Sequence, residues 1–188
     1  MKLKSIGALA LLLSTPVVAQ WQIDADASRL HFVSTKNAQV TEVHRFEKLS
    51  GELDKNGKLA VTVPLSSVNT NIAIRDTRMQ EKLFEVEQFP HATFTAQVPP
   101  TLTELETGEV IQGEVDGTLE LHGKTAPISF EVIVSRSDNM LTVTTVSPTI
   151  IDAKKFDLGA GIEALRAIAN LSSITFSVPV TFSVTFTQ

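Results

Sequence analysis

The chain of 188 residues contains no cysteine, no tyrosine and a single tryptophan. Without cysteine, the sequence excludes disulfides, thiol nucleophiles, thiolate metal sites and iron–sulfur clusters. Positive charge is also scarce, because 16 lysines and arginines face 21 aspartates and glutamates and give a formal net charge of -5. This balance argues against a general surface for nucleic acids or anionic membranes, which needs net positive charge. Hydrophobic residues make up 43% of the chain, enough to build a core and to exclude intrinsic disorder.

The first 19 residues have the layout of a secretory signal peptide. Lys2 and Lys4 precede an apolar run at 6–13, and small residues precede a cleavage position after Ala19. The run is shorter than the ~20 residues of a membrane-spanning helix, which disfavours the alternative of an uncleaved anchor. We predict export to a bacterial periplasm, with residues 20–188 as the mature domain. Loss of two lysines leaves 14 basic and 21 acidic residues in that domain, a net charge of −7.

Apolar and polar residues alternate along most of the mature chain. In the clearest run, 175–186, every even position is Phe or Val and every odd position is Thr, Ser or Pro. A period of two separates these residues onto the two faces of a strand, which no helix could do. Pro179 lies on the polar face of this run and predicts a bulge or a gap in strand pairing. The same alternation predicts about eight antiparallel strands, at 29–34, 43–53, 59–65, 94–98, 115–121, 128–134, 141–146 and 175–186.

Turn and helix signals complete the predicted architecture. The segments 54–57, which ends in Asn-Gly, and 122–124, with Gly at its centre, are typical of hairpin turns. Short helices are predicted at 74–86, which is rich in helix formers, and at 162–170, which is apolar on one helical face. We predict an all-β fold, an extended eight-stranded antiparallel barrel with one or two short helices at its mouth. A β-sandwich is the alternative, which periodicity alone does not separate from a barrel.

The aromatic residues indicate which way the apolar faces point. A membrane barrel presents its apolar face to lipid between girdles rich in Trp and Tyr, and ten Phe with one Trp cannot build two girdles. We therefore predict a soluble barrel whose apolar face points inward, as lumen lining or as packed core. The residues predicted to line the lumen are Phe32, Phe94, Leu119, Phe130, Val132, Phe176, Val178 and Phe182.

Several ordered motifs resemble those of the YceI-like family. Trp21-Gln22-Ile23-Asp24 is similar to the family's opening strand, and the segment 67–94, which ends in Phe89-Pro90-His91-Ala92-Thr93-Phe94, to its most distinctive run. The segment 115–127, with His122-Gly123-Lys124 inside it, is similar to the family's hairpin signature. The resemblance covers residues 21 to about 135 closely. It implies a lipocalin-like barrel in an exported protein that binds polyisoprenoids or other long amphiphilic lipids, with no catalytic activity assigned to the family as a whole.

Few polar residues form a candidate site. Arg75 and Arg78 are predicted to hold a phosphate or carboxylate head group at the mouth. The alternative is an Arg75–Asp76 pair that caps the helix. The four histidines lack metal-ligand spacing, and the sequence has neither a Gly-x-Ser-x-Gly nor a phosphate-binding glycine motif, so we expect no metal, cofactor or catalytic residue.

These observations lead to one functional prediction and one alternative. We predict a periplasmic protein that sequesters or carries a long-chain isoprenoid or fatty-type lipid in an apolar lumen. It would bind no nucleic acid, would not insert stably into membranes, and could form a homodimer. The alternative is a non-catalytic structural or stress-related periplasmic protein with a filled barrel.

Overall fold

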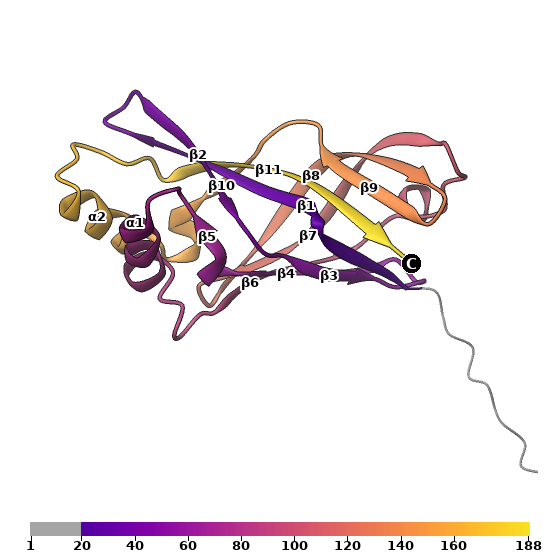
Figure 1. Cartoon of the computed structure of the whole chain (residues 1–188), viewed down its shortest axis with the longest axis horizontal. Coiled ribbons are helices and arrows are strands. Elements are labelled where there is room, and N and C mark those ends of the chain that lie inside the picture. The colour runs from indigo at the N-terminus through magenta and orange to yellow at the C-terminus, as the bar shows by residue number, and fades with distance from the viewer. Residues whose placement is uncertain (1–19) are drawn as a thin grey trace, which may run out of the picture.

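The computed structural model describes residues 20–188, and the predicted signal peptide lies outside this range. Figure 1 shows strands wrapped into an elongated body with the two α-helices at one end. The strands are β1 (Trp21–Lys36), β2 (Val40–Phe46), β3 (Ser50–Leu53), β4 (Lys58–Pro64), β5 (Val68–Asn69), β6 (His91–Gln97), β7 (Val110–Leu121), β8 (Lys124–Ser137), β9 (Met140–Thr145), β10 (Thr149–Asp152) and β11 (Ser177–Thr187). The helical elements are α1 (Ala73–Arg78), a π-helical turn η2 (Met79–Leu83), α2 (Gly159–Ile168) and the 3₁₀ turns η1 (Leu65–Ser67), η3 (Pro100–Leu102) and η4 (Ala153–Phe156).

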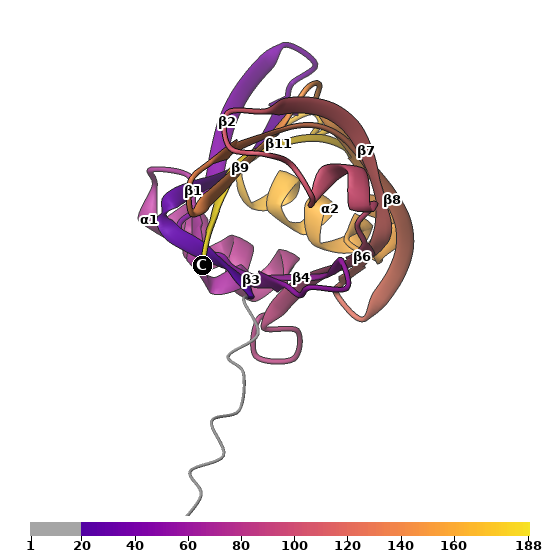
Figure 2. The same ribbon diagram turned by 90° about the vertical axis from the view of Figure 1, so that its right-hand side faces the viewer.

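The sheet closes on itself, because the last strand β11 pairs with the first strand β1. The closed ring runs β1-β3-β4-β6-β7-β8-β9-β11 and then returns to β1, and every pair in it is antiparallel. Figure 2, turned by 90° from Figure 1, shows this ring end on. The predicted eight-stranded barrel is therefore confirmed and the sandwich is wrong. Three further strands, β2, β5 and β10, extend the sheet beyond the ring.

The long strand β1 is shared between two partners. Its first residues pair with β3, as in Trp21↔Leu53, and its second half pairs with β2, from Leu30↔Phe46 to Lys36↔Val40. The single strand predicted at 43–53 is therefore wrong, because the chain breaks at 47–49 and forms two strands. The break has a physical cause: Glu47 donates its backbone N–H to the carbonyl of Ser67 and leaves the ladder of β1.

The two predicted hairpin turns are present. At 54–57 the Asp54 carboxylate accepts the backbone N–H groups of Asn56 and Lys58, and Gly57 has a positive φ of 78°. At the β7–β8 turn both His122 and Gly123 have positive φ, 52° and 70°, as a two-residue type I′ hairpin loop requires.

Pro179 falls in a gap between β1 and β11, as its position predicted. The paired residues reach Phe32↔Val180, and pairing resumes only at the isolated bridge Lys36↔Ile174. A proline has no N–H to donate at this point, so the gap leaves no backbone donor of Pro179 unsatisfied.

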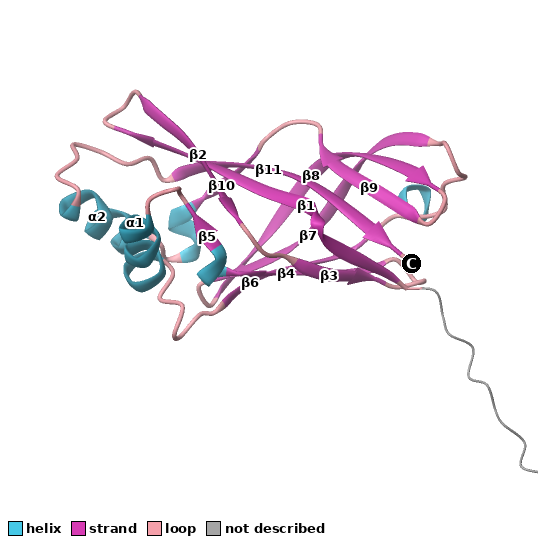
Figure 3. Cartoon of the chain, viewed as in Figure 1, coloured by secondary structure: helices cyan, strands magenta, loops and turns pink. Residues whose placement is uncertain are grey.

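The elements at the two ends of the barrel differ. Figure 3 shows α1, η2 and α2 together at one end, beside the projecting β1–β2 hairpin; we call this the mouth end. The opposite, distal end carries the short turn η3. The two predicted helices are confirmed with shifted limits, since 74–86 forms α1 and η2 and 162–170 forms α2 at Gly159–Ile168. Across residues 20–188, no helix is both long and apolar enough to cross a bilayer.

Buried apolar side chains form one cluster at each end of the barrel. The distal apolar cluster contains Trp21, Leu102 and Leu141, and the mouth apolar cluster contains Leu65, Phe156 and Ile162. Inward-facing residues between them, such as Phe94 and Phe130, are only partly buried although the barrel wall covers their outer side. The protein is therefore packed at its ends and hollow at its waist.

Candidate functional site

The hollow is a cavity of about 270 Å³ that runs between the two clusters. Every residue that lines it is Leu, Val, Ile, Phe, Ala or Met. The rings of Phe94, Phe130 and Phe182 meet edge to face at its waist, with centroids 5.2 Å apart in each successive pair. A wall with so few polar groups gives water no hydrogen-bond partner, so such a cavity stays dry and suits an apolar ligand.

Seven of the eight residues predicted to line the lumen are on this wall: Phe32, Phe94, Leu119, Phe130, Val132, Val178 and Phe182. Their contact with a ligand stays a prediction. Phe176 differs, because it lies outside the cavity, with the Lys154 ammonium 4.3 Å from its ring centroid. The strand β11 begins only at Ser177, and the alternation that would turn Phe176 inward holds only within the strand.

The helical part of the lining was not predicted from the sequence. Met79 and Leu83 of η2 and Ile162 of α2 face the cavity at the mouth end. Gly161 makes this packing possible, because a Cβ there would lie 2.6 Å from the carbonyl oxygen of Lys82. The apolar face of the segment 162–170 was visible in the sequence, but nothing in it showed that the face covers one end of a barrel.

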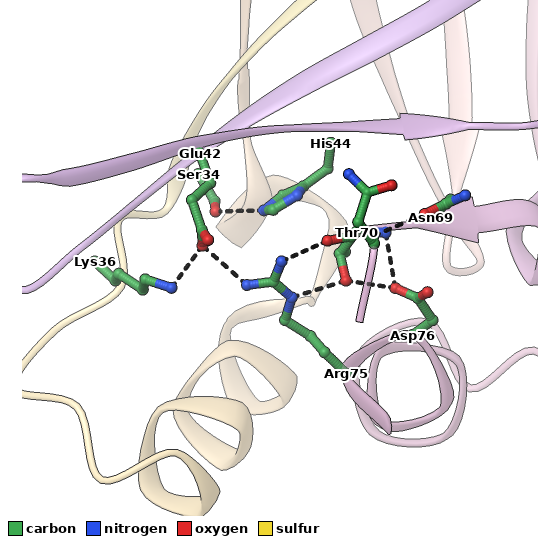
Figure 4. Close-up of polar contacts among 9 residues, drawn as sticks. Ser34, Lys36, Glu42, His44, Asn69, Thr70, Arg75 and Asp76 are labelled. Carbon is green, nitrogen blue, oxygen red and sulfur yellow. Dashed lines mark hydrogen bonds and ion pairs between the residues drawn. The ribbon is translucent and has the colours of Figure 1, made fainter. Parts of the chain in front are cut away.

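The inward faces of β1 and β2 change from apolar to polar as they approach the mouth. On β1 the sequence of inward residues is Leu30, Phe32, Ser34 and Lys36, of which the first two line the cavity. On β2 it is Phe46, His44 and Glu42, and only Phe46 lines the cavity. The register places Phe32 opposite His44 and Ser34 opposite Glu42. A set of polar side chains therefore lies next to the mouth end of the cavity. We call this set the mouth cluster and define it as Ser34, Lys36, Glu42, His44, Thr70, Arg75 and Asp76 (Figure 4).

Arg75 ties this cluster together. Its Nη1 donates to Glu42 Oε2 at 2.9 Å, its Nε to Thr70 Oγ1 at 2.8 Å and its Nη2 to the Thr70 carbonyl at 2.7 Å. Lys36 Nζ also donates to Glu42 Oε2, at 2.5 Å. The Lys36 hydrogen bond is the main cause that lowers the pKa of Glu42, with Arg75 adding to it against the opposing effect of burial. One carboxylate thus joins α1 to the β1–β2 hairpin through two cations.

His44 is the most enclosed ionisable group of the cluster. Burial lowers its pKa, and the nearby positive charge of Arg75 lowers the pKa further. Its Nε2 lies 3.1 Å from Ser34 Oγ, and its ring lies 5.2 Å from that of Phe32. The imidazole therefore connects the polar cluster to the cavity wall in its neutral form. Among residues 20–188 no carboxylate orients its other nitrogen, so Ser34 and His44 lack the third group of a nucleophilic triad.

The Arg75–Asp76 pair, the alternative to a head-group site, does not form. Asp76 instead accepts hydrogen bonds from the backbone N–H and the hydroxyl of Thr70, at 2.8 and 2.5 Å, and α1 has no side-chain cap. Arg78 is half-buried and makes no ion pair with any residue of the described chain. Of the two predicted head-group residues, Arg75 is held by Glu42 and Thr70, and Arg78 has its charge available.

The four histidines lie in different places. His122 bridges Glu85 and the Phe156 carbonyl at 2.8 and 3.2 Å, and His44 lies in the mouth cluster. Between residues 20 and 188 no group of three or more metal-binding side chains converges.

Comparison with known proteins identifies the family. A model of the YceI-like domain matches residues 21–186, almost all of the described chain. The chain belongs to the YceI-like family. A polyisoprenoid-binding domain from Saccharophagus degradans, implicated in plant cell wall breakdown, is 38% identical with a TM-score of 0.86, over 90% of this chain and 98% of that one.

Two less similar solved structures show a likeness of fold alone. BcnA of Burkholderia cenocepacia is 20% identical with a TM-score of 0.66, over 87% of this chain and 98% of that one. A YCEI protein of Campylobacter jejuni is 16% identical with a TM-score of 0.56, over 98% and 93% of the two chains. No curated protein matches the chain.

Proposed function

We propose that this YceI-like protein is a periplasmic carrier that sequesters a long-chain isoprenoid or a related amphiphilic lipid. The observation that carries the proposal is the wholly apolar cavity enclosed by the barrel. Likeness to a polyisoprenoid-binding domain at 38% identity supports the same ligand class. The signal-peptide layout of residues 1–19 supports export.

Affinity in this proposal comes from the tail. Each CH₂ removed from water contributes about 0.8 kcal/mol, so a long chain binds tightly without any polar contact. The cavity wall offers a tail nothing but apolar side chains. Binding of this kind needs no reacting group, and we propose a protein without catalytic activity.

The head of the ligand would lie at the mouth cluster. Ser34 and His44 are the first polar side chains beyond the lining residues of β1 and β2. Arg78, three residues after Arg75 on α1, has no ion-pair partner among residues 20–188, whereas Arg75 is already bound by Glu42 and Thr70. Arg78→Gln should therefore weaken binding of a phosphorylated isoprenoid more than binding of its alcohol. Equal losses for the two lipids would reject a head-group role for Arg78.

Native mass spectrometry of gently purified protein tests the carrier proposal. We expect a mass above that of the polypeptide, and uptake of an added isoprenoid alcohol by protein stripped of lipid. Val61→Trp, which places a large side chain in the cavity wall, should abolish uptake. Val110→Trp is the matched control, because Val110 lies outside the cavity and is largely exposed. A bare polypeptide mass together with no uptake by the wild type would overturn the proposal.

The alternative, a structural protein with a filled barrel, has less support. A filled barrel would leave its waist packed, whereas Phe94, Phe130 and Phe182 border open space. The periplasmic location has its own test: the protein should appear in osmotic-shock fluid of expressing bacteria, shortened by the residues before Gln20. Retention in the cytoplasm at full length would contradict it.

A further inference from the structure

The mouth end carries apolar side chains on its outer surface as well as on its inner one. Met79 and Leu83 of η2 face the cavity. Ile72, just before α1, and Ile74, in its first turn, are 46% and 57% exposed. Ile168, at the end of α2, is also exposed. The helical cap between cavity and solvent therefore presents isoleucines among its exposed polar residues, and packing against the barrel does not explain them.

The net charge of the protein is unevenly distributed between the two ends. We define the mouth half as residues 31–50, 63–93, 120–129 and 146–181, and the distal half as the rest of 20–188. The mouth half contains ten lysines and arginines and ten aspartates and glutamates, and the distal half contains four and eleven. The whole excess of −7 thus belongs to the distal half. The mouth half therefore has no net formal charge, although the mature chain as a whole is acidic.

The neutral half also exposes two lysines on the elements that pack against α1 and α2. Lys82 of η2 and Lys155 of η4 are exposed, and neither has an ion-pair partner among residues 20–188. The turn η2 packs against α1 and α2, and η4 packs against α2, so both lysines lie on elements at the mouth end. Exposed aliphatic side chains and unpaired cations at the same end of a protein are the combination that binds the interface of an anionic bilayer.

We propose that the protein docks reversibly, mouth end first, on an anionic lipid bilayer. Ile72 and Ile74 enter the interface between head groups and acyl chains, and Lys82 and Lys155 contact lipid phosphates. The acidic distal half is repelled by the same surface, which orients the barrel with its cap against the membrane. The proposal rests on the proposed function in one respect: a bilayer is the place where a long-chain lipid is collected or delivered.

Vesicle flotation of the purified protein tests the docking proposal. We expect binding to vesicles of phosphatidylethanolamine with phosphatidylglycerol and much weaker binding to vesicles of phosphatidylcholine. Ile72→Ser with Ile74→Ser should lower the partition coefficient about tenfold or more, because two side chains lose their burial in the interface. Lys82→Gln with Lys155→Gln should lower it by about tenfold on the anionic vesicles alone. The control for the isoleucines is Val110→Ser with Ile133→Ser, two residues of the barrel wall that are 67% and 40% exposed. The control for the lysines is Lys55→Gln with Lys58→Gln, in the distal half. Both control variants should bind vesicles like the wild type.

Uptake of an isoprenoid alcohol from solution, measured on the same variants, separates this proposal from the carrier function. Uptake without vesicle binding by the wild type would overturn docking and leave the carrier intact. Vesicle binding without uptake would support docking and overturn the carrier. Equal loss in the control variants would overturn docking through the mouth end. A dimer seen by light scattering that the Ile72→Ser, Ile74→Ser variant loses, with no vesicle binding, would assign the isoleucines to a second copy of the chain and overturn the proposal.

Discussion

Gly117 of β7 lies against the ring of Phe94, at the waist of the cavity. A Cβ at this position would lie 2.3 Å from Phe94 Cζ and 2.5 Å from the Thr95 carbonyl oxygen, whereas ordinary contacts begin near 3.4 Å. The ring has room to turn into the hollow, but the backbone oxygen of β6 can move only with its strand. We expect Gly117→Ala to cost about 1–3 kcal/mol, the range for an extra methyl group in a packed site. The displaced ring would also occupy cavity volume and weaken ligand uptake.

Urea unfolding measures the stability loss, which for a chain of this size corresponds to a fall in Tm of about 2–4 °C for each kcal/mol. The matched control is Gly159→Ala, where the nearest atoms would lie 3.9 Å from the new Cβ. Because Gly159 is in the first turn of α2, its replacement should be neutral or stabilising by up to about 1 kcal/mol. In a Phe94→Leu background, Gly117→Ala should cost less. An unchanged midpoint, or the same loss with and without the Phe94 ring, would refute the reasoning.

Three further predictions concern the mouth end. Burial lowers the pKa of His44, so the unfolded chain binds a proton at this residue at a pH where the folded protein does not. The free energy of unfolding should therefore fall as pH drops below about 6.5. In urea titrations at several pH values, His44→Gln should make that fall shallower. Glu42 has a lowered pKa, so its contribution to stability is present above about pH 4.3 and is lost as pH falls further. Glu42→Gln should lower the free energy of unfolding by about 1 kcal/mol or less at pH 7, since the Glu42–Arg75 pair is partly exposed. At the lowest pH of the urea titration the variant and the wild type should be equally stable. Phe156→Ala should cost about 3–5 kcal/mol in unfolding free energy, because this ring is fully buried in the mouth apolar cluster. A cost under about 1 kcal/mol would contradict its place there.

Strand periodicity predicted most of the fold because inward and outward positions alternate wherever the ladder is intact. Val178 and Phe182 follow this parity into the cavity, and Phe176, one step before β11 begins, does not. The break in the strand at 47–49 could not be predicted from the alternation either. Nothing in the local pattern shows that Glu47 pairs its backbone with Ser67, a contact across 20 positions of chain.

The mouth cluster was missed because its members are recognisable only through register. Ser34 and Glu42 look like ordinary polar ends of strands in the sequence, and no spacing motif distinguishes His44 from the other three histidines. Once the β1–β2 hairpin is paired, Ser34 faces Glu42 and His44 faces Phe32. The available signal was parity: these residues share the inward face with Leu30 and Phe46, which line the cavity. Arg75 was found from sequence, but its partner Glu42, 33 positions away, was not.

The difference between the two ends decides how a ligand would be oriented. A uniformly apolar cavity gives an apolar chain no preferred direction, so the ends must supply one. At the distal end the Arg136 guanidinium donates to the Leu105 carbonyl and lies 5.7 Å from the Trp21 ring, within a closed apolar cluster. At the mouth, Ser34 and His44 continue the cavity wall with hydrogen-bonding groups. A polar head is therefore better solvated at the mouth, and the tail extends toward Leu102 and Leu141 at the distal end.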